Sequence, residues 1–198
     1  MTSVDRLRDV VGSNDKVLAK TLKDKYRKLV EHEWGDLDDL DEDDQEEVQE
    51  GLKEFSNDVN RLIKGSSAKG LEPGAWVFVF KLIIDELNLK TSGNLPINKG
   101  YKHHYAWKPY RELIAASVAP SAVENLKHIE NGRPMKGKGL QDDGSSFAWL
   151  TAEEVAELHK SLTAVGVTDS ELRQFHEDLV QSLAILKDNN AALFVIAH

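Results

Sequence analysis

The chain has 198 residues, of which 40% are hydrophobic and 30% charged, and its formal net charge is −9. Chains of this length and composition bury a core of their own, so we expect a single domain over residues 1–198. Zero cysteines exclude disulfides, thiolate metal sites and cysteine nucleophiles, and no apolar run is long enough for a membrane helix. Because no signal peptide is recognisable either, the sequence predicts a cytoplasmic protein without a membrane partner.

The charge is unevenly distributed along the chain. Residues 31–50 contain twelve Asp or Glu and no Lys or Arg, so this segment carries −12 and the remainder +3. Residues 16–28 and 99–138 are locally basic. Two interpretations stay open: acidic and basic faces that partly neutralise one another, within the fold or across an oligomer, or a solvated acidic loop, which is what blocks of like charge usually form.

The N-terminal part, residues 1–90, is predicted to be helical. A short amphipathic helix over residues 4–11 ends at Gly12, and a second over residues 15–31 follows a cap at residues 13–15. A loop is expected over residues 33–44 and a third helix over residues 45–64. Apolar residues at helical spacing should point inward, namely Val17, Leu18, Leu22, Tyr26, Leu29 and Val30, then Val48, Leu52, Phe55, Val59, Leu62 and Ile63.

The acidic tract, residues 36–47, partly fits a calcium-binding loop. Counting Asp39 as position 1 places oxygen ligands at positions 3, 5, 9 and 12 (Asp41, Asp43, Glu47 and Glu50). However, Asp44 stands at position 6, where the sharp turn requires glycine, and Glu46 stands at the apolar position 8. These departures outweigh acidic matches that any aspartate-rich run produces. We therefore expect residues 36–44 to be exposed and to bind calcium no tighter than millimolar.

The segment that follows residue 72 is ambiguous between strand and helix. Residues 76–80 alone are typical of a strand, because they are β-branched or aromatic. Pro73, in contrast, suits a first helical turn, and apolar residues recur at intervals of 3, 4 and 3 (Val77, Phe80, Ile84 and Leu87). The length of the segment also favours a helix, so we predict a helix that is buried on nearly all sides.

Residues 91–146 are predicted to form loops and two short helices, over residues 110–117 and 121–129. The loop over residues 99–110 combines three tyrosines, a tryptophan, two histidines and three lysines, a mixture suited to contact with a partner. It would equally suit stacking on single-stranded nucleic acid. The predicted binding surface is Tyr101, His103, His104, Tyr105 and Trp107 beside Arg133, Lys136 and Lys138. In the alternative interpretation, Trp107 and Tyr110 only anchor the loop to the core.

The C-terminal part, residues 147–198, has the clearest pattern. Thr151 with Glu154, and Thr168 with Glu171, each have the spacing of a capping box and so predict two helix starts. Apolar stripes follow both starts (Val155, Leu158, Leu162 and Val165, then Leu172, Phe175, Leu179, Leu183 and Leu186). Residues 192–196 are apolar without alternation, which predicts a terminal strand buried on both faces.

Residues 147–158 (FAWLTAEEVAEL), the long helix after them and the final Ala-Leu-Phe-Val-Ile strand resemble the C-terminal half of the bacterial YfbM-like proteins. The resemblance covers roughly 50 to 60 residues and implies an α+β fold in a family without an established activity. It supplies no catalytic residue. It also implies an N-terminal strand, for which the start of this chain leaves little room.

Other chemistry finds little support in the sequence. His159 and His176 lie beside the apolar stripes with Glu157 and Glu177 nearby, but a metal site needs three or four converging ligands. Residues 133–139 could hold a phosphate, yet they lack the P-loop spacing. No nucleophile–base pair is recognisable either. We therefore predict no catalytic residue, no cofactor and no metal.

The sequence therefore predicts a predominantly helical α+β domain of seven to eight helices with a small sheet that includes the C-terminal strand. Its expected function is non-enzymatic binding of a protein partner, in one version an immunity-type protein whose acidic face neutralises a basic toxin. Nucleic acid is disfavoured by the overall acidity. The alternative is an enzyme with His103, His104, Asp142 and Asp143 in a cleft near residues 99–109 and 133–146.

Overall fold

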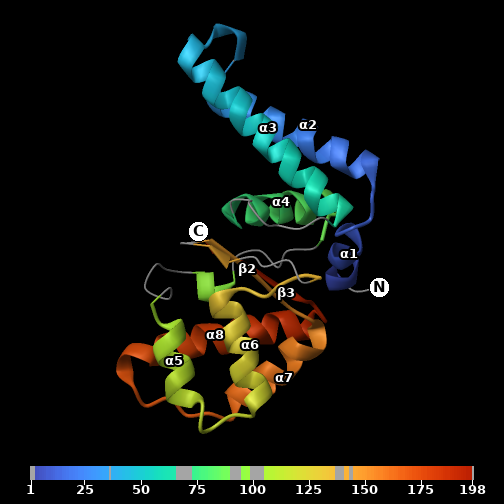
Figure 1. Cartoon of the computed structure of the whole chain (residues 1–198). Helices are drawn as coiled ribbons and strands as arrows, with labels where there is room; N and C mark the ends of the chain where they lie inside the picture. Colours follow the sequence, from blue (N-terminus) through green and yellow to red (C-terminus); the bar gives the residue numbers. More distant parts are fainter. Residues whose placement is uncertain are drawn as a thin grey trace. The chain divides into compact units, whose positions relative to one another are not determined.

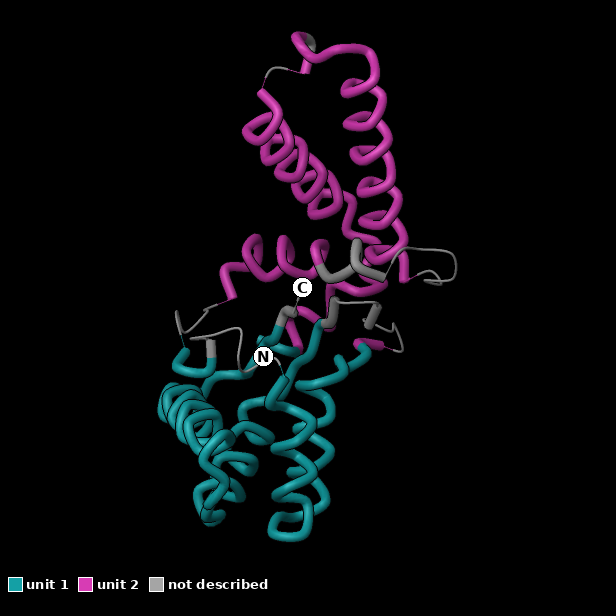
Figure 2. The backbone as a smooth tube through the Cα atoms, turned by 90° about the vertical axis from the view of Figure 1, so that its left-hand side faces the viewer, with its two compact units in different colours: residues 1–4, 90–134, 146–198 teal, residues 5–89, 135–145 magenta. Residues whose placement is uncertain are grey.

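The computed structural model describes residues 3–35, 37–65, 73–89, 95–98, 105–136, 141–142 and 145–197. Within these ranges it contains eight α-helices, two short 3-10 helices and three short strands. The predicted fold class, predominantly helical α+β with a small sheet that includes the C-terminal strand, is confirmed. Figure 2 shows two compact units: unit 1 comprises residues 1–4, 90–134 and 146–198, and unit 2 comprises residues 5–89 and 135–145. The single domain predicted over residues 1–198 stays a prediction.

A helical hairpin dominates unit 2 (Figure 1). After α1 (Ser3–Val10), Asp15 caps α2 (Lys16–Trp34) by accepting hydrogen bonds from the backbone N–H groups of Val17 and Leu18. Helix α3 (Glu42–Lys64) packs back against α2. The connection between them, which includes the 3-10 helix η1 (Leu37–Asp39), is shorter than the predicted loop over residues 33–44. Asp41 caps α3. The first turn that follows contains Glu42, Asp43 and Asp44, and the helix dipole favours negative charge there.

The apolar stripes of the hairpin are only partly covered. Leu22 and five residues of α3 are buried as predicted (Val48, Phe55, Val59, Leu62 and Ile63). Val17 and Leu29, in contrast, are 78% and 46% exposed, so the inward orientation predicted for them is wrong. Val17 belongs to the first turn of α2, and Leu29 lies beside the stripe that Tyr26, Val30 and Trp34 form at helical spacing.

The turn between α1 and α2 packs against the end of α3. The backbone N–H groups of Gly12 and Asn14 donate to the carbonyls of Leu62 and Ile63 at 3.1 and 2.9 Å. Gly65, the C-cap of α3, has a φ of +67°, and a Cβ built on it would lie 3.0 Å from the Cα of Gly12. Glycine is therefore required at this contact both for its φ and for its missing side chain.

Helix α4 (Pro73–Glu86) confirms the helix predicted for this segment. Its side chains are described from Phe78 onward, and those of Val79, Phe80, Leu82, Ile83 and Ile84 are buried. Tyr26, Phe55 and Phe78 form an aromatic cluster between α2, α3 and α4, in which the rings of Tyr26 and Phe55 stack at 3.9 Å. The two-residue strand β1 (Gln141–Asp142) completes unit 2.

Unit 1 packs four helices around a single apolar core. These are α5 (Trp107–Ile114), α6 (Pro120–Asn131), α7 (Ala152–Thr163) and α8 (Ser170–Asp188). The 3-10 helix η2 (Pro96–Asn98), which precedes them in the chain, packs against the same core. Helix α5 begins three residues before its predicted start at residue 110, which brings Trp107 into the helix. The buried residues of the predicted stripes on α7 and α8 meet in this core (Val155, Leu158, Leu162, Phe175, Leu179, Leu183 and Leu186).

Strands β2 (Ser145–Leu150) and β3 (Leu193–Ala197) pair antiparallel, with Trp149 opposite Phe194. β2 extends back into the predicted Gly-rich loop over residues 133–146. Its residues 147–150 are buried on both faces. In β3, Leu193 is buried, whereas Phe194 and Val195 are half-buried, so burial on both faces is less complete than predicted.

One of the two predicted capping boxes is present. Thr151 Oγ1 accepts from the Glu154 N–H at 3.2 Å, and the Glu154 carboxylate accepts from the Thr151 N–H at 2.8 Å. The second box, Thr168 with Glu171, is wrong. Asp169 caps α8 instead, because its carboxylate accepts from two backbone N–H groups at the helix start.

Candidate functional site

The predicted aromatic-basic surface is described only in part. Tyr101, His103, His104 and Lys138 lie outside the described residues. Tyr105 is 65% exposed, whereas Trp107 packs edge-on against Phe175 with ring centroids 4.8 Å apart. Trp107 is therefore partly buried and packs against the core of unit 1. That these residues together form one binding surface stays a prediction.

Tyr110 anchors the same segment from within the core. Its side chain is fully buried, and its hydroxyl lies 2.7 Å from Nδ1 of His176 on α8. Burial raises the pKa of Tyr110 and lowers that of His176, so the pair is neutral at physiological pH. The anchoring role that the alternative interpretation gave to Trp107 and Tyr110 matches these contacts.

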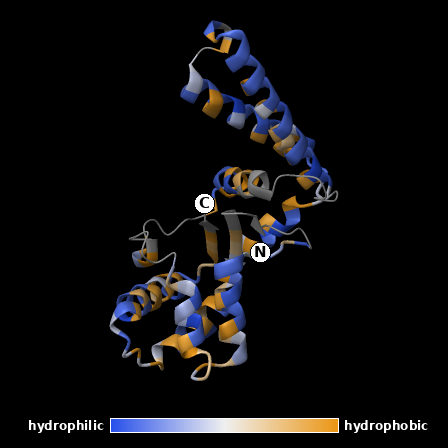
Figure 3. Ribbon diagram, turned by 60° about the vertical axis from the view of Figure 1, so that its left-hand side comes forward, coloured by the Kyte–Doolittle hydropathy of each residue, from blue (hydrophilic) through white to orange (hydrophobic). Residues whose placement is uncertain are grey.

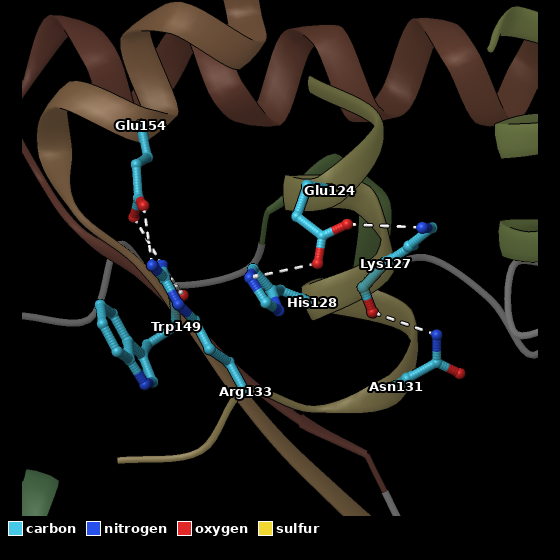
Figure 4. A network of polar contacts seen from close by, with 7 residues as sticks. All are labelled: Glu124, Lys127, His128, Asn131, Arg133, Trp149 and Glu154. Carbon is cyan, nitrogen blue, oxygen red and sulfur yellow. Dashed lines mark hydrogen bonds and ion pairs between the residues drawn. The ribbon is translucent and has the colours of Figure 1, made fainter. Parts of the chain in front are cut away.

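Arg133 is held within unit 1 by three kinds of contact, shown in Figure 4. Its guanidinium donates two hydrogen bonds to the carboxylate oxygens of Glu154, at 2.7 and 2.9 Å, and one to the carbonyl of Trp149 at 3.1 Å. It also stacks over the indole ring of Trp149 at 3.7 Å. The arrangement ties the segment after α6 to β2 and to the start of α7, which is a structural role.

The electrostatics of this network follow from its partial burial. Burial by itself would raise the pKa of Glu154, but hydrogen bonds from Arg133 and from the Thr151 N–H lower it below its usual value. Burial, assisted by the positive charge of Arg133, lowers the pKa of His128 on α6. Figure 4 shows His128 turned toward Glu124 on its own helix. The network therefore contains an ionised Arg–Glu pair beside a neutral histidine.

The remaining predicted chemistry does not come together among the described residues. Lys136, in unit 2, donates to the carbonyl of Val11 at 2.8 Å. For the enzyme alternative, His103, His104 and Asp143 lie outside the described residues, and Asp142 lies on β1. No group of three His, Asp or Glu side chains in the described ranges is placed to hold a metal. Of the calcium-loop positions counted from Asp39, those from Glu42 onward are helical.

The described residues of the acidic tract lie at the end of the hairpin at which α2 and α3 connect. Figure 3 shows hydrophilic residues along most of both helices. Among the residues of segment 31–50 whose exposure is described, nine acidic residues are exposed (Glu31, Glu33, Asp39, Asp41, Glu42, Asp43, Glu46, Glu47 and Glu50). Glu31 pairs with Arg27 at 3.3 Å, but among the described residues no ion pair neutralises the acids from Asp39 to Glu50. In the described part of the chain, this end of the hairpin therefore carries a concentrated negative charge that no ion pair neutralises.

A cavity of about 430 Å³ lies between α2 and α3 beside this charge. Figure 2 shows the two helices spreading apart toward their connection. Successive turns of α2 line the cavity with Tyr26, Val30 and Trp34, of which Trp34 is 40% exposed. Burial and then the nearby carboxylates of Glu33 and Glu54 raise the pKa of Tyr26, so its hydroxyl keeps its proton.

Helix α3 supplies the polar side of the cavity. Glu47, Glu50 and Glu54 line it on successive turns, with Val48 and Gly51 between them. Gly51 has helical geometry, and a Cβ built on it would meet no atom within 4 Å. Glycine inside a helix is less stable than alanine by about 0.5–1 kcal/mol. Packing therefore does not require glycine at this position, whereas a larger side chain would narrow the cavity.

Sequence reasoning missed this cavity for a specific reason. The predicted loop over residues 33–44 includes Trp34, which hides the helical spacing of Trp34 with Tyr26 and Val30. A usable signal was present in α3, where Gly51 interrupts an otherwise strong helical pattern between Glu47 and Glu54.

No protein-family model, curated protein or solved structure matches the chain. The resemblance of residues 147–198 to the YfbM-like proteins therefore stays a prediction. No helix in the described ranges is both long and apolar enough to cross a membrane. The candidate site thus depends on its own geometry: an acidic hairpin end with a cavity of mixed aromatic and acidic lining.

Proposed function

We propose that the protein is a non-enzymatic binding domain of the bacterial cytoplasm that captures a basic protein through the acidic end of its α2–α3 hairpin. The observation that carries the proposal is the charge from Asp39 to Glu50, which no ion pair among the described residues neutralises and most of which lies on α3, a helix with buried apolar residues. In its most specific form the protein is of immunity type and neutralises a basic toxin.

Concentrated charge of one sign suits this role physically. It accelerates the encounter with an oppositely charged partner and excludes partners of like charge. It also lowers the stability of the isolated hairpin through self-repulsion, which a basic partner would relieve. The first turn of α3 accounts for the placement of Glu42, Asp43 and Asp44 through the helix dipole, but not for Glu46, Glu47 and Glu50 farther along the helix.

Site-specific photo-crosslinking in the native host tests the proposal. A photoreactive phenylalanine analogue at Gln49, exposed on α3, should trap a basic protein that mass spectrometry identifies. The same analogue at Gln181, which is also exposed and lies on α8 in unit 1, is the matched control. The adduct at Gln49 should weaken in the variant Glu46→Gln, Glu47→Gln, Glu50→Gln and as salt rises, because exposed charges are screened beyond roughly 8–10 Å.

Three outcomes would contradict the proposal. One is trapping of the same protein from Gln49 and Gln181 alike, and another is an adduct at Gln49 that neither salt nor charge removal affects. The third is the absence of any specific adduct at Gln49.

A further inference from the structure

The cavity between α2 and α3 has a lining and a glycine that ordinary core packing does not require. It has aromatic and valine walls from α2 and three carboxylates from α3, and a glycine in the interior of α3 lies in its wall although packing leaves room for a Cβ there. The carboxylates of Glu47, Glu50 and Glu54 lie along about two turns of helix. An elongated organic cation with an apolar stem would match this lining better than a compact metal ion.

Unit 1 contains an internal example of the same recognition. There the guanidinium of Arg133 stacks over the indole of Trp149 and binds the carboxylate of Glu154 through two hydrogen bonds. A planar guanidinium suits this combination because it can stack on a ring and meet a carboxylate with two N–H groups, which an ammonium cannot do. Trp34 with Glu47 and Glu50 offers the same two kinds of group beside an open cavity.

We infer that this cavity is the binding pocket for an arginine side chain of the partner protein. The guanidinium stacks on Trp34 and is bound by the carboxylates from α3, while the methylene stem contacts Val30 and Val48. The surrounding acidic tract attracts the partner, and the pocket selects arginine over lysine. This inference rests on the proposed function, since it names the side chain through which a basic partner is held.

An NMR titration of the full chain with small arginine compounds tests the pocket directly. Acetyl-arginine-N-methylamide should shift the Trp34 indole and the Val30 and Val48 methyl resonances saturably, with millimolar affinity for a single side chain. The citrulline analogue, which has the same shape without the charge, and the lysine analogue should each bind at least tenfold more weakly. Spermidine, a polyamine without a guanidinium, serves as the competing class of cation.

Gly51→Leu provides the structural control, since its side chain should occupy the cavity. It should abolish the saturable shifts while the variant stays folded, because leucine favours the helix and the site leaves room for a Cβ. Asn57→Leu, which adds the same side chain at an exposed position of α3, should leave binding unchanged. Gly51→Ala should fold at least as stably as the parent and bind more weakly than Asn57→Leu.

The inference is overturned by equal shifts with the citrulline analogue, by shifts that persist in Gly51→Leu, or by tighter binding of spermidine. Its failure can be told apart from failure of the proposed function. A basic protein trapped at Gln49 without arginine binding in the cavity would leave the function standing and remove the pocket. Arginine binding without a trapped protein would remove the proposed function and leave only a cavity that binds the arginine side chain.

Discussion

Arg133 joins three segments of unit 1 with a single side chain. Two hydrogen bonds from the guanidinium to Glu154 fix the start of α7, and a third, to the Trp149 carbonyl, reaches β2. The backbone N–H of Arg133 also donates to the carbonyl of Phe147 in β2 at 2.9 Å. Both charged side chains are largely shielded from solvent, at 19% and 26% exposure. A pair of this kind resists replacement, because removing one member leaves the other buried without its partner.

We therefore expect Arg133→Ala to lower the free energy of unfolding by about 2 kcal/mol, the scale of lost charge-assisted hydrogen bonds. Arg133→Lys should recover less than half of this loss, since lysine keeps the charge but loses the paired hydrogen bonds and the stacking on Trp149. Denaturant unfolding followed by circular dichroism measures both values. Full recovery by lysine would show that charge alone matters at this position.

Asp58 is the most perturbed carboxyl group described in unit 2. It is 4% exposed on α3, and burial raises its pKa to about 6, with Arg61 opposing the shift and Glu54 adding to it. A pKa that is higher in the folded than in the unfolded chain means that ionisation disfavours folding. The contribution of Asp58 to stability is thus present at acidic pH and is lost as pH rises through about 6.

Asp58→Asn should consequently stabilise the protein above pH 6 and flatten its stability between about pH 4 and 6. The gain at pH 7.5 should be on the order of 2–3 kcal/mol, since each unit of pKa shift corresponds to about 1.4 kcal/mol. Unfolding measured across this pH range provides the comparison. A less stable variant at pH 7.5 would mean that the ionised carboxylate makes a required contact.

At the scale of elements, helix starts and apolar stripes could be read from the sequence because they depend on local chemistry. The Thr151–Glu154 box and the stripes of α7 and α8 are examples. The covering of a stripe depends on distant segments instead. Leu29 and Val17 are apolar residues at helical spacing, yet the structure leaves them 46% and 78% exposed, and the cavity beside Trp34 depends on the spacing of two separate helices.

The contact between the α1–α2 turn and the end of α3 gives a prediction at this scale. Gly65→Ala should destabilise the protein by about 1–2 kcal/mol or more, because alanine is strained at positive φ and its Cβ would press against Gly12. Gly51→Ala in the same helix is the matched control and should stabilise the protein by about 0.5–1 kcal/mol. Thermal and denaturant unfolding of the two variants should therefore change in opposite directions. Equal effects would refute this account of the turn.

At the scale of the whole molecule, the sequence revealed that negative charge is concentrated over residues 31–50, but not what that charge surrounds. Locating the cavity required knowing that α2 continues to Trp34 and that α3 begins at Glu42. The predicted aromatic-basic surface, which stays a prediction, meets a related limit. Composition cannot distinguish an aromatic ring that faces a partner from one that packs inward, as Trp107 does against Phe175.

Hydrogen exchange of the complex formed with the trapped partner tests the central claim most directly. If the acidic hairpin end is the binding site, backbone amides within residues 26–54 should exchange at least tenfold more slowly in the complex. Amides of α6 and α8 in unit 1 should keep the rates of the free protein. Protection confined to unit 1, or centred on residues 105–136 with the hairpin unchanged, would contradict the account and favour the aromatic-basic surface instead.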